Sequence, residues 1–324
     1  MGPLNADSRW MAAALALSER SRGRTAPNPN VGCVIVKQGR VVGRGWTQPG
    51  GRPHAEAMAL AEAGEAARGA TVYTTLEPCA HVSPRGPACS DLLVAAGVAR
   101  VVAALGDPDA RTNGQGAERL RAAGIDVAEG VAEAGARAAM AGFLTRQAKG
   151  RPFVTLKLAT SLDGRIAMAS GESRWITGPE ARAHAHVERA RHEAILVGRA
   201  TFEADAPGLD VRLPGLEDRS PRRLLLTRGK GETGWEVLAS PSAIANLETV
   251  DHLLVEGGAE TASSFLRAGL VDRLLLYRAP ILIGAGRDAL GDIGLADLAS
   301  AHGRWKLNDT RTLGSDRLEV YAAS

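Results

Sequence analysis

The strongest constraint on this chain is a set of metal-ligand side chains between residues 54 and 89. His54 opens the segment, and Cys79 and Cys89 close it. Imidazole nitrogen and thiolate sulfur are ligands that Zn²⁺ prefers, and a site with three protein ligands keeps a fourth position for water. We therefore expect His54, Cys79 and Cys89 to hold one Zn²⁺ per chain in a catalytic site.

Glu56 is expected to carry protons at this site. It lies two residues from His54, is not required as a ligand, and carries a carboxylate that can take up and return protons. The order His-x-Glu and then Pro-Cys is typical of zinc deaminases, although nine residues separate Cys79 from Cys89 here instead of two. A closed structural site that includes His81 is the alternative, but such sites usually show short paired cysteine spacings.

Composition argues against a nucleic-acid or membrane protein. The net charge of +3 is small, and residues 54–89 contain almost no aromatic side chains on which a flipped base could stack. No run of about 18 apolar residues occurs, so no membrane span is expected. Three cysteines do not form a disulfide framework, and Cys33 lies in an apolar strand that belongs in a core. We expect a cytoplasmic protein that acts on a small molecule.

Length and residue pattern predict two α/β domains. A chain of 324 residues can bury two cores, and Gly150 and Pro152 interrupt the helical pattern. We therefore expect domains at 1–148 and 149–324. The first alternates helices at 7–21, 54–63, from 89, 115–123 and 133–147 with strands at 31–36, 41–46, 72–75, 101–104 and 125–128, as in an α/β layer sandwich.

The second half also alternates strands with helices. It has no Gly-x-Gly-x-x-Gly after its first strand, so the Rossmann fingerprint is absent. Gly257-Gly258 joins a strand to a helix, and such a turn either presents backbone N–H groups to a phosphate or is only a tight connection. Strands are expected at 153–159, 194–197, 223–227, 253–255, 273–279 and 317–321, with helices from 178 and up to 268.

Motifs in both halves resemble the bifunctional deaminase–reductase family of riboflavin biosynthesis. They occur in family order over nearly the whole chain, and this family widens the cysteine gap relative to cytidine deaminases. The motifs are Asn28-Pro29-Asn30-Val31-Gly32-Cys33, His54-Ala55-Glu56, Glu77-Pro78-Cys79-Ala80-His81, Gly86-Pro87-Ala88-Cys89, Lys157-Leu158-Ala159-Thr160-Ser161-Leu162-Asp163-Gly164-Arg165, Gly171-Glu172-Ser173-Arg174-Trp175 and Val255-Glu256-Gly257-Gly258.

The resemblance implies two reactions. The N-terminal domain, a cytidine-deaminase-like α/β/α layer sandwich, would hydrolyse the 2-amino group from 2,5-diamino-6-ribosylamino-4(3H)-pyrimidinone 5′-phosphate. The C-terminal domain, a dihydrofolate-reductase-like α/β fold, would then reduce the ribosyl group to ribityl with NADPH. A homodimer or higher homo-oligomer through the reductase domain is also implied.

The resemblance assigns residues in the second half. Arg189 and Arg212 suit a phosphate, because a guanidinium can bind it through two hydrogen bonds. Lys157 and Asp163 are either structural or near the sugar. The cofactor residues would be Ala159, Trp175, Thr201, Asp205, Gly258, Ala259, Glu260, Thr261, Ala262, Ser263 and Ser264, and the substrate residues Ser173, Arg189, Leu209, Arg212 and Glu256.

Two parts of the chain leave alternatives open. The Asn28–Asn30 loop either contacts the pyrimidine or is only a rigid turn. The family usually has Asp-Ser where this chain has Thr227-Arg228, and residues 213–250 are shortened. An arginine there would favour NADP over NAD by meeting its 2′-phosphate. A deaminase with an inactive reductase half is the alternative function, whereas the intact zinc-ligand set disfavours a non-catalytic binding protein.

Overall fold

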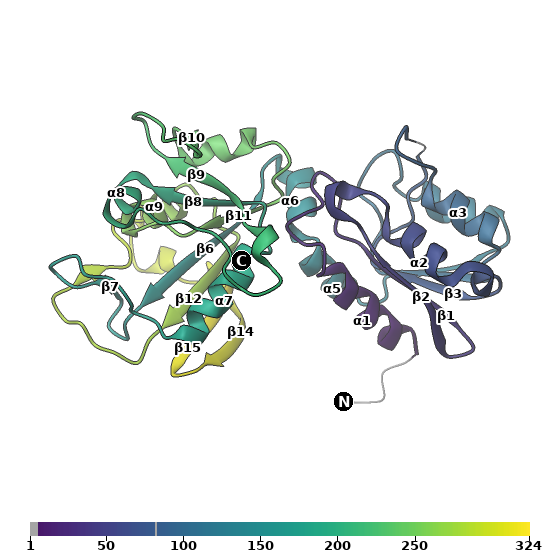
Figure 1. The fold of residues 1–324 in the computed structure, drawn as a ribbon, viewed down its shortest axis with the longest axis horizontal. Helices are drawn as coiled ribbons and strands as arrows, with labels where there is room; N and C mark the ends of the chain where they lie inside the picture. The colour runs from purple at the N-terminus through teal and green to yellow at the C-terminus, as the bar shows by residue number, and fades with distance from the viewer. Residues whose placement is uncertain (1–5, 82) are drawn as a thin grey trace. The chain divides into compact units, whose positions relative to one another are not determined.

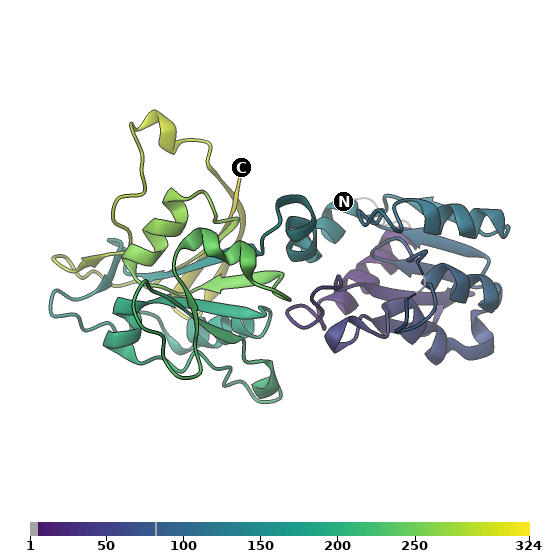
Figure 2. The ribbon, with the colours of Figure 1, turned by 90° about the horizontal axis from the view of Figure 1, so that it is seen from above.

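The computed structural model describes residues 6–81 and 83–324. The chain divides into two compact units, Met1–Lys149 and Gly150–Ser324 (Figures 1 and 2). Within the described ranges, no helix is long and apolar enough to cross a membrane.

The first unit is built on a mixed five-stranded sheet with the order β2-β1-β3-β4-β5. The first two strands form an antiparallel hairpin, β3 runs antiparallel to β1, and β3, β4 and β5 are parallel. The strands are β1 (Gly32–Lys37), β2 (Arg40–Trp46), β3 (Thr71–Thr74), β4 (Arg100–Ala103) and β5 (Asp126–Glu129). The helices are α1 (Ala6–Ser18), α2 (Ala55–Ala63), α3 (Cys89–Ala96), α4 (Gln115–Ala122), α5 (Glu133–Ala139) and α6 (Ala141–Lys149).

Helices cover both faces of this sheet, as the α/β/α expectation requires. Figure 1 shows α1 and α5 on one side and α2 and α3 on the other. The helix that follows His54 packs closely on the hairpin, because a Cβ atom on Gly45 of β2 would lie 2.0 Å from the Ala55 carbonyl oxygen. Cys33 is fully buried in the apolar core, as predicted.

The single helix expected at 133–147 is two helices in the structure. It breaks at Met140, whose side chain is fully buried in the core of the unit. The side-chain amide of Asn30 donates to the Ala139 carbonyl oxygen at 3.2 Å. This bond satisfies a carbonyl at the end of α5 and holds the break.

The second unit has an eight-stranded sheet with the order β10-β9-β8-β11-β6-β12-β15-β14 and a two-stranded sheet of β7 and β13. The first six strands in this order are parallel, and the last two pairings are antiparallel. Its strands are β6 (Phe153–Thr160), β7 (Arg165–Ala167), β8 (Ala194–Gly198), β9 (Arg222–Leu226), β10 (Glu236–Leu238), β11 (His252–Val255), β12 (Arg273–Arg278), β13 (Arg287–Asp288), β14 (Trp305–Leu313) and β15 (Asp316–Ala323). Its helices are α7 (Pro179–Arg189), α8 (Arg199–Asp205) and α9 (Ala259–Arg267).

Parallel pairing decides where this unit can place a site. The carboxyl ends of β6, β8, β9 and β11 lie at one edge of the sheet, which is where ligands bind in open α/β sheets. The residues that end or directly follow these strands are Thr160, Gly198, Thr227 and Glu256.

Several elements of the second unit were not expected from the sequence. The α8 helix has seven residues, β7 three and β13 two, which are too short to show a clear periodicity. The longer β14 lies at the edge of the sheet, and most of its side chains are exposed. It therefore lacks the alternating apolar pattern of a half-buried strand.

Candidate active sites

Three potential zinc ligands meet in the first unit. The Nδ1 atom of His54 lies 3.4 Å from Cys89 Sγ and 3.6 Å from Cys79 Sγ. All three ligand atoms lie within 4.8 Å of one another. Tetrahedral zinc, with bonds of roughly 2.0–2.3 Å to nitrogen and sulfur, keeps such atoms about 3.5–3.8 Å apart. The donor set and its spacing therefore fit zinc.

The local fold positions these ligands. His54 immediately precedes α2, Cys89 begins α3, and the Cys89 N–H donates to Cys79 Sγ at 3.3 Å. Hydrogen bonds from Cys89, assisted by His54, lower the pKa of the Cys79 thiol to about 4, although its burial opposes this shift. The surroundings thus stabilise a thiolate at Cys79, the form that binds a metal, whereas the bond to Cys79 and burial raise the pKa of Cys89.

Glu77 anchors the loop that carries Cys79. Its side chain is buried beside the start of α4. Negative charge at a helix N-terminus is favourable, since the first N–H groups of a helix have no partner within it. The carboxylate accepts hydrogen bonds from the backbone N–H groups of Asp107 at 3.2 Å, Gly114 at 2.9 Å, Gly116 at 3.0 Å and Ala117 at 3.1 Å.

Glu56 lies in the first turn of α2 with its carboxyl group buried. The Thr74 hydroxyl donates to the Leu76 carbonyl oxygen at 3.0 Å and lies 3.4 Å from Oε1 of Glu56. Burial raises the pKa of Glu56, neighbouring His54 opposes that rise, and Cys79 adds to it. A carboxyl group with a raised pKa exchanges protons more readily at neutral pH.

The two asparagines of the 28–30 loop have different surroundings. The Asn28 side-chain amide lies 3.1 Å from Nε2 of His54, on the opposite side of the ring from the sulfurs. Asn30 is buried, and its amide donates to the carbonyls of Ser18 and Ala139. Asn30 is therefore part of the framework, whereas Asn28 orients a zinc ligand.

A cavity of about 780 Å³ lies at the carboxyl edge of the large sheet in the second unit. The turn at Gly257 and Gly258 forms one wall, and the Gly258 N–H donates to the Thr201 hydroxyl at 2.9 Å. A Cβ atom on Gly257 would lie 2.5 Å from Cβ of Thr261, so the close turn requires glycine. Of the expected cofactor residues, Ala159, Thr201, Asp205, Gly258, Ala259, Glu260, Thr261 and Ser264 line this cavity.

Three expected cofactor residues lie elsewhere. Ala262 is fully buried in the apolar core, and Ser263 is buried with its hydroxyl accepting from the Gly291 N–H at 2.8 Å. Helical periodicity turns these two side chains away from the cavity. Trp175 is 65% exposed and lines the neighbouring cavity instead.

This second cavity, of about 590 Å³, adjoins the first. Lys157, Ser173 and Glu256 are among the residues that line both. Most of the residues expected to bind the cofactor therefore lie next to the residues expected to bind the substrate. All five expected substrate residues line the second cavity: Ser173, Arg189, Leu209, Arg212 and Glu256.

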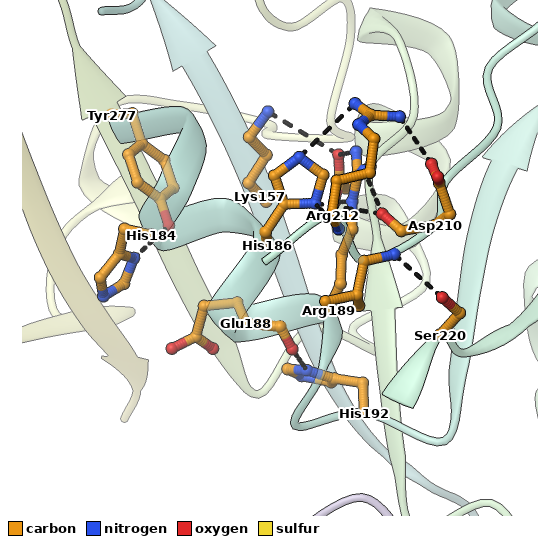
Figure 3. Close-up of polar contacts among 12 residues, drawn as sticks. Lys157, His184, His186, Glu188, Arg189, His192, Asp210, Arg212, Ser220 and Tyr277 are labelled. Atoms are coloured by element: carbon orange, nitrogen blue, oxygen red, sulfur yellow. Dashed lines mark hydrogen bonds and ion pairs between the residues drawn. The ribbon is translucent and has the colours of Figure 1, made fainter. Parts of the chain in front are cut away.

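The Arg189 guanidinium, expected to bind a phosphate, already has acceptors within the protein. Its Nε and Nη2 atoms donate to the two oxygens of Glu256 at 2.8 and 2.9 Å. Its Nη1 atom donates to the carbonyl of Asp210 at 3.1 Å, and Figure 3 shows Arg189 beside Asp210. Burial would raise the pKa of Glu256, but Lys157 and Arg189 lower it to about 2. The pair is thus ionised, and Arg189 holds Glu256 and the 210 loop in place.

The two residues left open by sequence have separate roles. The exposed carboxylate of Asp163 accepts hydrogen bonds from the Ser161 hydroxyl at 2.6 Å and the Gly284 N–H at 2.7 Å, so it joins two loops. The Lys157 ammonium lies 3.9 Å from Glu256, where the two cavities meet. Asp163 is structural, whereas Lys157 faces the candidate site.

Sequence reasoning missed Arg182 and His186, which also line the second cavity. With Arg189 they occupy positions i, i+4 and i+7 of α7, a spacing that puts them on one helix face. That spacing was the available signal. The shortened 213–250 segment contributes Thr227, Arg228, Ser240 and Pro241 to the first cavity.

Family models match most of the chain. Residues 4–105 match the "Cytidine and deoxycytidylate deaminase zinc-binding region", and residues 152–233 and 237–318 match the "RibD C-terminal domain". The first match contains all three potential zinc ligands and the second contains both cavities.

Full-length relatives match both units together. The chain is 42% identical over 359 aligned residues to the riboflavin biosynthesis protein RibD of Escherichia coli, with 96% of this chain and 97% of the relative covered. Among solved structures, Acinetobacter baumannii RibD superposes with a TM-score of 0.86 at 37% identity, covering 98% of this chain and 99% of that one. A Thermotoga maritima diaminohydroxyphosphoribosylaminopyrimidine deaminase/5-amino-6-(5-phosphoribosylamino)uracil reductase superposes with a TM-score of 0.89 at 33% identity and the same coverage.

Proposed function

This chain belongs to the RibD family of bifunctional deaminases and reductases of riboflavin biosynthesis, and on that premise we propose which residues perform each reaction. The family's deaminase uses zinc and its reductase uses NADPH. We assign deamination to residues 1–148 and reduction to residues 149–324. The reductase assignment is supported by the two adjoining cavities at the carboxyl edge of the second sheet. The deaminase assignment is supported by the close approach of His54, Cys79 and Cys89.

The substrate of the first reaction is 2,5-diamino-6-ribosylamino-4(3H)-pyrimidinone 5′-phosphate. His54, Cys79 and Cys89 would hold the zinc through Nδ1 and two sulfurs, and Asn28 would keep the His54 ring turned toward it. When bound, zinc supplies the Lewis acidity that makes water a nucleophile at neutral pH. One C–O bond forms, one C–N bond breaks, and ammonia leaves.

Glu56 moves the protons of this hydrolysis. Its buried carboxylate would take a proton from the attacking water and pass protons to the ring nitrogen and the leaving amine. Burial, which raises the pKa of Glu56, suits a group that must both accept and return a proton.

In the second reaction the cofactor and sugar would occupy adjoining cavities. The residues that would hold NADPH, which supplies a hydride when bound, are Ala159, Thr201, Asp205, Gly258, Ala259, Glu260, Thr261 and Ser264. Ser173, Trp175, Leu209, Arg212 and Glu256 would hold the sugar phosphate.

Lys157 is a candidate proton donor for the second reaction. Its ammonium lies where the two cavities meet, beside the Glu256 carboxylate. It can therefore protonate the sugar oxygen that becomes a hydroxyl when the ribosyl carbon accepts a hydride.

The reductase unit also supports a homodimer or higher homo-oligomer. Large apolar side chains are exposed on it, including Leu282 (76% exposed), Leu298 (78%) and Leu307 (50%). Covering such side chains with a second copy would remove them from water. Light scattering tests this proposal, since a monomer at micromolar concentration would contradict it.

The proposed location is the cytoplasm. The zinc ligands include two thiols that must stay reduced to bind metal, and the cytoplasm keeps thiols reduced. Fractionation of cells that express the tagged chain tests this location.

Glu56→Gln tests whether the deaminase and reductase reactions use separate sites in one chain. The variant should keep stoichiometric zinc and release ammonia at least about 100-fold more slowly, which is within the usual contribution of a general acid–base group. Supplied with 5-amino-6-(5-phosphoribosylamino)uracil, it should oxidise NADPH at the wild-type rate. Loss of both activities, with zinc still bound and the fold intact, would contradict the assignment of separate sites.

A further inference from the structure

The second cavity contains one more group suited to a phosphate. Arg189 is engaged by Glu256 and the Asp210 carbonyl, so its three guanidinium nitrogens already have acceptors. The remaining basic side chains that line this cavity are Lys157, Arg174, Arg182, His186 and Arg212.

We propose that His186 binds the 5′-phosphate of the reductase substrate together with Arg212, and that it makes this unit selective for the phosphorylated substrate. This proposal rests on the reductase function proposed above. Arg189 then acts as a positioning residue that holds Glu256 and the 210 loop.

The His186 ring is fixed between α7 and the loop that carries Arg212. Its Nδ1 lies 3.1 Å from the Asp210 carbonyl oxygen and 3.3 Å from the Arg212 backbone nitrogen. Its Nε2 lies 3.5 Å from Nη2 of Arg212 (Figure 3). The Arg212 side chain is 59% exposed and donates through Nη1 to Asp210 at 2.6 Å. A phosphate that binds Arg212 would therefore meet the Nε2 edge of His186.

The charges around His186 favour a neutral ring before the phosphate binds. Arg189 faces it from the same helix, Arg212 and Asp210 from the loop, and Glu256 from the end of β11. Burial lowers the pKa of His186, the two arginines lower it further, and the Asp210 carbonyl and Glu256 oppose them. A phosphate dianion would add negative charge beside Nε2, so binding should take up a proton.

A protonated ring can make two charge-assisted contacts at once. Nδ1–H would donate to the Asp210 carbonyl and give up the bond that the Arg212 N–H donates to Nδ1 in this structure, and Nε2–H would donate to a phosphate oxygen. A neutral ring lacks one of these protons. The contribution of His186 should therefore increase as the pH falls toward the pKa of the ring in the free protein.

Two substitutions separate ligand binding from a purely structural role. In His186→Asn the amide can reach the position of Nδ1 and keep the contact to Asp210, but nothing replaces Nε2. In His186→Gln the amide can reach the position of Nε2 without a charge. His302→Asn is the matched control, because His302 is exposed and lies outside both cavities.

The test measures reductase kcat/KM with 5-amino-6-(5-phosphoribosylamino)uracil and with the same compound after removal of the phosphate. His186→Asn should lower kcat/KM by roughly 10- to 100-fold for the phosphorylated substrate, the range of one charge-assisted hydrogen bond. The loss with the dephosphorylated substrate should be far smaller. Equal losses with both substrates, or no loss with either, would overturn the proposal.

The pH dependence of inhibition by ribose 5-phosphate provides a second readout. For the wild type, its inhibition constant should decrease as the pH falls from about 8 to 6.5, a range that lies above the phosphate's own second pKa of about 6. For His186→Gln the constant should change much less, and identical profiles would contradict the proposal. If the wild type itself fails to reduce the uracil compound, the reductase function is wrong, and the phosphate inference fails with it.

Discussion

The side-chain amide of Asn28 lies 3.1 Å from Nε2 of His54, while Nδ1 of the same ring faces the sulfurs of Cys79 and Cys89. The Asn28 atom at this distance is Nδ2. A histidine that binds zinc through Nδ1 carries its proton on Nε2, so the Asn28 amide would turn over to present its side-chain oxygen as the acceptor of that proton. Such a partner fixes both the tautomer and the orientation of the ring. Asn28→Ala should therefore weaken zinc binding by roughly 10- to 100-fold.

Competition with a zinc chelator measures this effect. Asn28→Asp keeps an acceptor oxygen and should retain zinc more nearly as the wild type does. If Asn28→Ala and the wild type release zinc at the same chelator concentration, the contact has no role in holding the metal.

Glu77 should stabilise the first unit through its four backbone hydrogen bonds. In Glu77→Gln an NH₂ group replaces one carboxylate oxygen and faces N–H donors, so bonds are lost at a buried position. We expect the free energy of unfolding to fall by about 2–3 kcal/mol, as for loss of a charged hydrogen-bond acceptor. Urea denaturation measures the unfolding free energy, with Glu118→Gln as the control, because Glu118 is an exposed residue of α4. Equal midpoints for the two variants would show that Glu77 does not anchor α4.

The Arg189–Glu256 pair should make the stability of the second unit depend on acidity. Its surroundings lower the pKa of Glu256 from the ordinary 4.5 to about 2. A carboxyl group whose pKa is lower in the folded than in the unfolded protein stabilises the fold at pH values above the unfolded-state pKa. This stabilisation is lost as the pH falls through the folded-state pKa. The difference in unfolding free energy between wild type and Glu256→Gln should shrink by about 3 kcal/mol between pH 4.5 and 2.

Urea denaturation at several pH values measures that difference. Glu260→Gln is the control, because Glu260 is exposed on the first turn of α9. A constant difference between the wild type and Glu256→Gln over this range would contradict the ionised pair.

Arg228 should distinguish NADPH from NADH. It follows β9 and lines the cofactor cavity with an exposed side chain, as a contact to a 2′-phosphate would require. Arg228→Ala should lower kcat/KM for NADPH by roughly 10-fold and leave that for NADH nearly unchanged. Lys230→Ala is the control, because it also removes one positive charge. Lys230 lies two residues after Arg228, and its side chain does not line the cavity. If each variant lowers kcat/KM equally for NADPH and NADH, Arg228 does not bind the 2′-phosphate.

The zinc ligands could be predicted from sequence because their chemistry is local. His54 and Cys89 each lie at the start of a helix, and imidazole nitrogen and thiolate sulfur are among the ligands that zinc prefers. The contact from Asn28 to His54 spans 26 residues and depends on how the hairpin places one loop beside α2. No spacing rule reveals such a contact.

The reductase site was harder to predict for the same reason. Arg189 and Glu256 are 67 residues apart and meet only because the last residue of α7 reaches the residue that follows β11. The sequence therefore predicted Arg189 as a phosphate ligand without revealing its pairing with Glu256. The identity of the residues in the site followed from motifs, whereas their partners depended on the sheet order.

The central claim is that one chain deaminates the pyrimidine and then reduces its sugar. The most direct test incubates the zinc-loaded protein with 2,5-diamino-6-ribosylamino-4(3H)-pyrimidinone 5′-phosphate and follows ammonia and NADPH absorbance together. Ammonia should appear with or without NADPH, and NADPH should be consumed after a lag, one molecule per ammonia at completion. Ammonia without any NADPH consumption would contradict the reductase half, and no ammonia from protein with stoichiometric zinc would contradict the deaminase half.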